Sequence, residues 1–257
     1  MIRQNSLILG CDIEIHSATK YLCGHHDVMA GLIATNHPQT SKKLAHLINS
    51  TGCALAPHDC WLLHRGMKTL AVRLDRQQRN ARWIAAVLHS LGFLVRYPGI
   101  PGHVGNDIHY AQALGPGAVF SFHPAATDDA DTAAQFLAQL KLFSISVSFG
   151  CVNSLASLPC RMSHASIPVE VRRARGLDEA LVRLCIGIED VRDLWDDLFQ
   201  GLKNTDLLQQ LPNGLWVATY PRKDHSPHTG VDLQHGWIVS EQQLIEDDLA
   251  ENLKICP

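Results

Sequence analysis

The sequence lacks an apolar run of the roughly 18–20 residues that a membrane-spanning helix requires. It also carries little net charge, with a formal value of −3 from 22 basic and 25 acidic residues. A nearly neutral chain has no electrostatic reason to bind nucleic acid or an anionic membrane, so we expect neither as a partner. The apolar content of 46% excludes a mostly disordered chain, and 257 residues suffice for one large or two modest domains.

Paired cysteine motifs are also missing, because none of the eight cysteines forms a C-x-x-C sequence. Several cysteines lie in apolar runs, where such residues usually behave as small buried hydrophobes in a reducing compartment. No charged and apolar leader of the secretory type is evident, so we expect a cytoplasmic location, with an organelle as the alternative. The cysteines are Cys11, Cys23, Cys53, Cys60, Cys151, Cys160, Cys185 and Cys256.

One group of potential metal ligands is present, since Cys53, His58, Cys60 and His64 lie within twelve residues. A structural zinc site needs closely paired ligands and a second pair, and this spacing provides neither. We therefore predict no metal site.

The apolar residues alternate between a period of two and a period near 3.6, which is typical of an α/β protein. Helices are predicted from the N-cap Ser41 to Gly52, over 67–91 with Gly92 as the stop, over 131–143 and over 191–202. Strands are predicted at 11–16, 28–35, 93–97, 118–122, 145–147 and 182–186. Glu189 and Asp190 are expected to cap the last helix, because acids suit a helix N-terminus.

The last part of the chain, 206–257, differs in charge and patterning. It holds eight acidic and three basic residues, a net of −5, which leaves +2 for the preceding residues. Turn residues are scattered through it, and its one helical candidate is 241–253. We expect a weakly structured appendage.

A polar segment between the first two predicted strands contains Ser17, Thr19 and Lys20. The two hydroxyl groups suit a phosphate, and Lys20 could form a Schiff base if its ammonium group were desolvated enough to lose a proton. Considered by itself, the composition favours the simpler interpretation of an exposed loop lysine.

Longer motifs around this lysine resemble one enzyme family. The run HSATKYLCGHHDVMAG at 16–31 is similar to the cofactor-lysine segment of the Cys/Met metabolism family of pyridoxal-phosphate enzymes. Runs at 55–70, 97–99, 148–155, 162–168 and 181–190 resemble further segments of that family in the same order. The resemblance covers about 5–204, and several long motifs in register make it specific. FGCVNSL at 149–155 and PCRMSH at 159–164 are most similar to the fungal and plant cystathionine β-lyase branch.

The resemblance implies an α/β fold that is the carboxyl-terminal part of a fold-type I pyridoxal-phosphate-dependent transferase, with the large domain incomplete. Residues 1–66 would end the large cofactor-binding domain. Residues 67–205 would form the connecting helix and the small α/β domain, and 206–257 an atypical tail.

The resemblance also assigns roles to five residues. Lys20 would bind the cofactor through its amine and move the proton of the substrate α-carbon. Ser17 and Thr19 would bind the cofactor phosphate through hydroxyl and backbone donors. Arg183 would hold the substrate α-carboxylate through its planar fork, with help from Ser154. His25 and His26 are taken as structural.

The implied activity is that of a carbon–sulfur lyase that converts L-cystathionine to L-homocysteine, pyruvate and ammonia in methionine biosynthesis. A cystathionine γ-synthase or γ-lyase of the same family is the near alternative. A truncated non-catalytic paralogue or partner subunit is the alternative of another class. The family resemblance further implies pyridoxal 5′-phosphate as cofactor and a homotetramer.

One departure from the family qualifies this prediction. In the family, an aspartate about two dozen residues before the lysine pairs with the pyridine nitrogen. Counting back from Lys20 places that aspartate before Met1, together with the ring-stacking tyrosine and the phosphate-binding glycine loop. We therefore expect little activity from this chain alone, and an incomplete sheet with apolar surface exposed at its edge.

Overall fold

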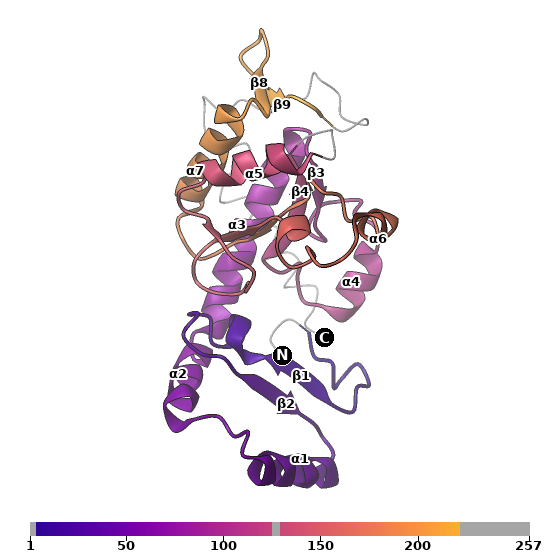
Figure 1. Cartoon of the computed structure of the whole chain (residues 1–257), viewed down its shortest axis with the longest axis vertical. Helices are drawn as coiled ribbons and strands as arrows, with labels where there is room; N and C mark the ends of the chain where they lie inside the picture. The colour runs from indigo at the N-terminus through magenta and orange to yellow at the C-terminus, as the bar shows by residue number, and fades with distance from the viewer. Residues whose placement is uncertain (1–3, 125–128, 222–257) are drawn as a thin grey trace, which may run out of the picture.

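The computed structural model describes residues 4–124 and 129–221, which form two parts joined by one long helix (Figure 1). The lower part in the figure contains β1 (Glu14–Ser17), the π-helix η1 (Ala18–Leu22), β2 (Gly31–Ala34), α1 (Pro38–Thr51) and α2 (Pro57–Met67). The long helix is α3 (Leu70–Ser90). The upper part contains β3 (Leu94–Arg96), α4 (Asn106–Gln112), β4 (Val119–His123), α5 (Ala130–Gln139), β5 (Ser144–Ile145), β6 (Leu155–Ser157), the 3-10 helix η2 (Pro159–Arg161), α6 (Val169–Ala174), β7 (Val182–Cys185), α7 (Val191–Asn204), β8 (Leu208–Gln210) and β9 (Trp216–Ala218).

A five-stranded sheet organises the upper part, with the order β3-β4-β7-β6-β5. All neighbouring strands are antiparallel except β5 and β6, which are parallel. In the register of the central strands, Arg183 of β7 lies between Ser121 of β4 and Ser157 of β6. The sheet is therefore mixed, with a polar row crossing its centre.

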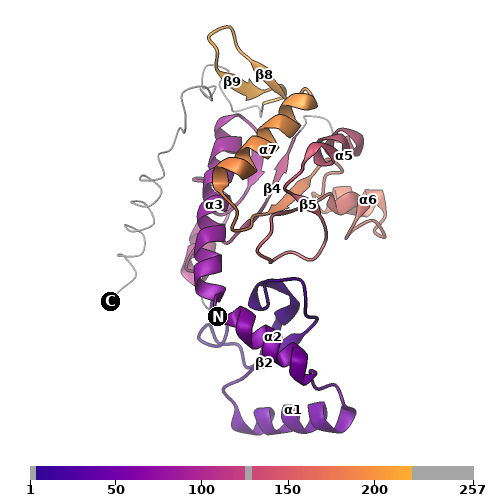
Figure 2. The same cartoon turned by 90° about the vertical axis from the view of Figure 1, so that its left-hand side faces the viewer.

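One face of this sheet is covered by α3, α5 and α7, and the main core lies between them. Phe120 and Phe122 alternate along β4 with less buried residues and point into this core, as Leu184 does from β7. The helices contribute fully buried side chains such as Leu88 and Leu198. Figure 2 shows α7 beside α3 on this side of the sheet.

The opposite face of the sheet meets the lower part of the molecule. Cys185 of β7 stands beside Val119 of β4 and Leu155 of β6 in the strand register. Tyr21 of η1 packs against this row. Because strand side chains alternate between faces, Arg183 and Cys185 lie on the same face, which is the one that meets η1.

The sequence predicted most of these elements to within a few residues. Gly52 ends α1 in the left-handed conformation (φ +71°), and Gly92 (φ +99°) follows α3, as expected. The start of α1 was predicted wrongly, because Pro38, not a residue after Ser41, opens the helix. The helices α2, α4 and α6 and the strand β6 were not predicted, and a break near Thr69 separates α2 from α3.

The expectation of a weakly structured tail is wrong for 206–221. Leu208 and Ala218 are buried in the main core, on a β8–β9 hairpin. Ala218 N also donates to Leu91 O at 2.8 Å, just beyond the end of α3. The helical candidate at 241–253 lies outside the described residues, and the divisions at 66 and 205 remain predictions.

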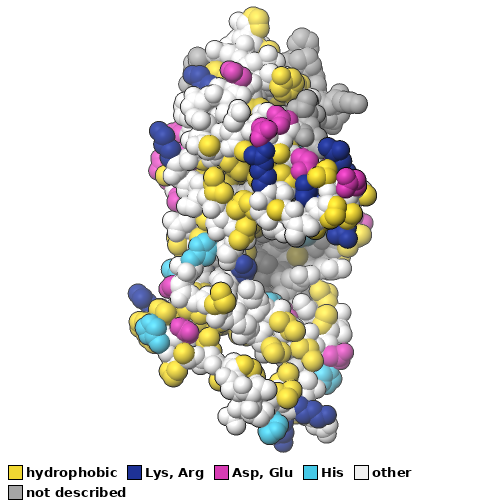
Figure 3. All heavy atoms as spheres, in the orientation of Figure 1, with side chains coloured by type: hydrophobic (Ala, Val, Ile, Leu, Met, Phe, Trp, Pro, Cys, Tyr) yellow, Lys and Arg dark blue, Asp and Glu magenta, His cyan; other side chains and the backbone are white. Residues whose placement is uncertain are grey.

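The lower part exposes apolar surface, as predicted for an incomplete sheet. β1 and β2 form a sheet of only two strands, and 74% of the Ile15 side chain and 87% of Met29 are exposed. No residue of α1 is buried, although Leu47 and Ile48 belong to its apolar stripe. Figure 3 shows hydrophobic side chains on the surface of this end of the molecule. Such surface is unusual for a sheet and helix that have all their packing partners.

Within 4–124 and 129–221, every helix is too short or too polar to cross a membrane.

Candidate functional site

Lys20 lies in η1, the short helix that follows β1. Its backbone angles (φ −84°, ψ −129°) are not helical, so the chain changes direction at this residue. The half-buried side chain reaches the upper part of the molecule, where Nζ donates a hydrogen bond to Ser148 Oγ at 2.8 Å. The interpretation of Lys20 as an exposed loop lysine is therefore wrong, because its amine is held between the two parts.

The side-chain hydroxyl groups of Ser17 and Thr19 differ in the hydrogen bonds that they already form. Ser17 is exposed at the end of β1, and its hydroxyl makes no hydrogen bond to the described residues. The Thr19 hydroxyl accepts from Ala30 N at 2.9 Å and donates to Ala30 O at 3.4 Å. The Ala30 carbonyl also accepts from the amides of Ala18 and Thr19. Among the described residues, Ser17 thus has the freer hydroxyl, whereas Thr19 holds the residue before β2 against η1.

Arg183 projects from the centre of the sheet on the face that meets η1. It is half-buried between Ser121 and Ser157, and its guanidinium has no hydrogen bond or ion pair among the described residues. Two residues farther along β7, Cys185 Sγ lies 3.6 Å from the hydroxyl of Tyr21, the neighbour of Lys20. An unpaired guanidinium at this place can bind a carboxylate through two parallel hydrogen bonds.

Ser154 is completely buried, and its polar groups have protein partners. Its hydroxyl donates to Glu189 Oε2 at 3.0 Å and accepts from Gly187 N at 2.8 Å. Its backbone N–H donates to Glu189 Oε1 at 2.6 Å. Glu189 was expected to cap α7, which is wrong, because its carboxylate holds Ser154 instead. Asp190 does cap α7, since its side chain accepts from Arg192 N at 2.8 Å.

Two ionisable groups near Lys20, the Tyr21 phenol and the Cys185 thiol, are neutral near pH 7. Burial raises the pKa of the Tyr21 phenol well above its ordinary value. Burial also raises the pKa of the Cys185 thiol to about 11. Neither group is therefore ionised as a nucleophile at neutral pH.

The loop that carries Ser148 is fastened to the Lys20 segment at several points. His26, in the left-handed region at φ +58°, donates from Nε2 to Ser148 O at 2.7 Å. Val152 N donates to Gly24 O at 3.0 Å. His25 likewise binds backbone, since its Nδ1 donates to Cys23 O at 2.7 Å. The structural role expected for both histidines stays a prediction.

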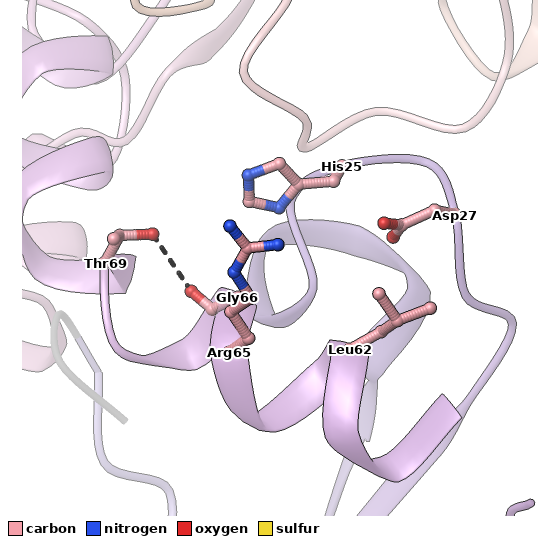
Figure 4. A pocket seen from close by; sticks show the side chains of 6 residues that line it. All are labelled: His25, Asp27, Leu62, Arg65, Gly66 and Thr69. Carbon is pink, nitrogen blue, oxygen red and sulfur yellow. Dashed lines mark hydrogen bonds between the residues drawn. The ribbon is translucent and has the colours of Figure 1, made fainter. Parts of the chain in front are cut away.

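A small cavity opens beside the Lys20 segment. It holds about 230 Å³ and is lined by His25, Asp27, Leu62, Arg65, Gly66 and Thr69. Figure 4 shows the Arg65 guanidinium pointing toward the His25 ring, and Thr69 Oγ1 donates to Gly66 O at 3.1 Å. Lys20 does not line this cavity, so the cavity borders the candidate site without containing its reactive amine.

The group of Cys53, His58, Cys60 and His64 does not form a metal site in the structure. His58 packs against the Trp61 ring at 5.9 Å between centroids. Cys60 Sγ donates to Leu55 O at 3.6 Å. Throughout 4–124 and 129–221, no three histidine, cysteine or acidic side chains come together as potential ligands.

The candidate site therefore combines a half-buried primary amine, a free hydroxyl and a free guanidinium. An amine can form a covalent bond with an aldehyde, and hydroxyl and guanidinium donors suit a phosphate and a carboxylate. These residues fit pyridoxal phosphate and an amino-acid substrate.

The sequence patterns did not indicate Ser148 as the partner of Lys20, nor the role of Glu189. Arg73, Gln77 and Asn80 on α3 were not predicted either, and they are polar but buried. Their spacing was a usable signal, because three polar residues at i, i+4 and i+7 share one face of a helix.

Comparisons with known proteins identify relatives of this arrangement. The profile of the family described as Cys/Met metabolism PLP-dependent enzyme matches residues 2–203. A cystathionine β-lyase from Neurospora crassa is 52% identical over 215 residues, which are 84% of this chain and 46% of the relative. The cystathionine β-lyase of Saccharomyces cerevisiae is 41% identical over 250 residues, 93% of this chain and 54% of the relative. The chain thus spans about half the length of these relatives.

A solved structure of a related enzyme has the same fold over most of this chain. The crystal structure of cystathionine γ-synthase from Xanthomonas oryzae pv. oryzae in complex with cystathionine matches with a TM-score of 0.74 and 35% identity. The match covers 79% of this chain and 53% of that one. The predicted fold class, part of a fold-type I enzyme, is confirmed.

Proposed function

Because the chain belongs to the Cys/Met metabolism family of pyridoxal-phosphate-dependent enzymes, we propose that it is part of a carbon–sulfur lyase. The proposed reaction converts L-cystathionine to L-homocysteine, pyruvate and ammonia. The observation that carries the proposal is the placement of Lys20, whose amine lies at the junction of the two parts on the sheet face that bears Arg183. The names of the two fungal relatives favour this β-lyase reaction.

The proposed roles follow from the side-chain groups that could bind the cofactor or the substrate. Pyridoxal phosphate, when bound, supplies an electron sink for negative charge on the substrate α-carbon. Lys20 would hold the cofactor and move the proton at that carbon, with Ser17 and Thr19 at the phosphate. Arg183 would bind the substrate α-carboxylate. Ser154 would assist through the position of its loop, since its hydroxyl is held by Glu189.

The first test is a chimera in which residues 2–203 replace the matching segment of the Neurospora crassa relative. With pyridoxal phosphate and L-cystathionine, we expect pyruvate and homocysteine as products. Cysteine with 2-oxobutyrate would favour the γ-lyase alternative. A folded chimera that carries the cofactor and forms no product would favour the non-catalytic alternative. Residues 1–257 alone, as the comparison, should react at least about a hundredfold more slowly.

Arg183→Lys in this chimera should raise the KM for cystathionine about tenfold or more, with a smaller change in kcat. A lysine ammonium keeps the charge but loses the two parallel hydrogen bonds to the carboxylate, which contribute roughly 1.5–3 kcal/mol. Steady-state kinetics measures the two constants separately. Arg175→Lys, an exposed arginine on a loop, is the control and should change neither constant. An unchanged KM in Arg183→Lys would contradict the carboxylate role.

Two further parts of the proposal concern the whole protein. We propose a homotetramer, to be tested by sedimentation equilibrium, for which a monomer at micromolar concentration would be the contrary result. We also propose a cytoplasmic location, to be tested with a fluorescent fusion of the natural gene.

A further inference from the structure

One face of α3 is polar although it is buried. Arg73, Gln77 and Asn80 project from the same side of the helix, and only 4%, 0% and 2% of their surfaces are exposed. We call these three residues the α3 polar stripe. Burying a polar side chain is unfavourable unless it forms hydrogen bonds, so the partners of the stripe indicate its role.

Arg73 binds the segment that follows Lys20. Its Nη1 donates to Tyr21 O at 3.0 Å and its Nη2 to Gly66 O at 2.9 Å, with a longer bond from Nη2 to Leu22 O at 3.4 Å. Tyr21 and Leu22 are the last residues of η1, and Gly66 lies in the last turn of α2. Arg73 therefore binds the carbonyl ends of two helices at once.

This placement explains how a buried guanidinium is tolerated without a carboxylate partner among the described residues. The carbonyl end of a helix carries partial negative charge, which favours a cation. Burial lowers the pKa of Arg73 from its usual value, yet a guanidinium stays charged at neutral pH. Gly24 has φ +76°, which favours glycine, and a β-carbon there would lie 2.2 Å from Arg73 Nη1, so the guanidinium would have to shift.

Gln77 and Asn80 bind two other loops in the same way. Gln77 Nε2 donates to Cys151 O at 2.6 Å. Asn80 Nδ2 donates to Gly187 O at 3.1 Å and to Glu189 O at 2.9 Å. Each residue of the stripe thus supplies donors to the backbone of a different loop.

The three loops are also joined to one another in the order in which the stripe meets them. Val152 N donates to Gly24 O at 3.0 Å, and Ile188 N donates to Val152 O at 2.8 Å. The three residues of the stripe span about 10 Å along the helix axis, because an α-helix rises about 1.5 Å per residue. The first loop carries Lys20, the second carries Ser148 and Ser154, and the third carries the carboxylate of Glu189 that holds Ser154.

We propose that the α3 polar stripe is a positioning element of the active site, which sets the backbone of these three loops relative to one another. Arg73 positions the Lys20 segment, Gln77 the 148–154 loop, and Asn80 the 187–189 loop. The inference rests on the proposed function, because the loops form an active site only if Lys20 holds the cofactor.

Hydrogen–deuterium exchange of residues 1–257 without cofactor tests the stripe directly. Arg73→Met should speed exchange of the amides at 21–24 at least tenfold and leave 187–189 within twofold. Asn80→Leu should give the reverse pattern, and Arg79→Met, an exposed residue of the same helix, should change neither. If Asn80→Leu does not fold, Gln77→Met replaces it, with the acceleration expected at 151–153. Equal acceleration at all three loops, or none, would overturn the proposal.

The rate of Lys20 modification gives a second readout. Pyridoxal phosphate is added at saturation, the product is fixed with borohydride, and the modified peptide is identified by mass spectrometry. Arg73→Met should lower the rate at Lys20 at least fivefold, and Arg73→Lys should recover part of it, because lysine retains a cation with donors. A wild-type rate in Arg73→Met would contradict the positioning role. This readout uses the chimera, and if Lys20 of the chimera with Arg73 in place is not modified, the proposed function fails, while the exchange pattern still tests the stripe.

Discussion

Lys20→Ala should abolish covalent attachment of pyridoxal phosphate at this position and lower lyase turnover of the chimera by about a thousandfold or more. A positioned proton-transfer group contributes roughly 10²–10⁴-fold in rate, and here the same amine also holds the cofactor. The described residues beside Lys20 offer no replacement, because burial keeps Tyr21 and Cys185 in their neutral forms near pH 7.

A second variant at position 20 separates the effect of the reactive amine from the effect of its positive charge, and a variant on α1 is the control. Lys20→Arg keeps the charge and approximate reach but has no primary amine, so it should be as inactive as Lys20→Ala. Lys43→Ala removes an exposed lysine of α1 and should leave attachment and turnover unchanged. Borohydride fixation with peptide mapping measures attachment, and pyruvate release measures turnover. More than a tenth of the wild-type turnover in Lys20→Ala would contradict the role of this residue.

Gly150→Ala should destabilise the folded chain by about 3 kcal/mol, from strain at positive φ together with overpacking. Gly150 has φ +114°, and a β-carbon on it would lie 2.8 Å from the backbone nitrogen of Tyr21 and 3.2 Å from the carbonyl carbon of Lys20. Two of the three nearest atoms are backbone and cannot turn aside as a flexible side chain would, and the third is Cδ2 of the Tyr21 ring, at 3.0 Å. The 148–152 loop and the Lys20 segment would have to separate.

Gly214→Ala is the matched control for backbone strain. It also has a positive φ, +83°, but nothing lies within 4 Å of the position of its β-carbon. We expect it to cost about 1–2 kcal/mol, the strain of the left-handed conformation alone. Urea unfolding compares the two variants. Equal losses would show that the close contact with Tyr21 contributes nothing, and the junction of the two parts would then be looser than described.

Part of the candidate site could be predicted because it is encoded in short stretches of sequence. Lys20, Ser17 and Thr19 belong to one continuous run, and its likeness to a known cofactor segment identified them before any packing was considered. Arg183 was found in the same way, within the run at 181–190. Helix ends such as Gly52 and Asp190 were also predictable, since capping depends on residues only a few positions apart.

The remaining features depend on residues that are distant in the chain. Lys20 and Ser148 are 128 positions apart, and no pattern near either residue indicates the other. The role of Glu189 was predicted wrongly for the same reason. An acid beside a helix N-terminus fits a cap equally well, and only the folding of the 148–154 loop places Ser154 against its carboxylate.

The sequence by itself therefore determined the α/β class, most strands and helices, and the residues of the cofactor-lysine run, because local periodicity, capping and motif order suffice for these. Only the tertiary structure decided which polar side chains form hydrogen bonds within the protein and which do not. Within 4–124 and 129–221, the side chains of Ser17 and Arg183 have no hydrogen-bond partner, whereas Ser154 is enclosed and Arg73, Gln77 and Asn80 bind backbone. The physical reason is that burying a polar group without a hydrogen-bond partner is unfavourable, and packing decides which partners come within reach.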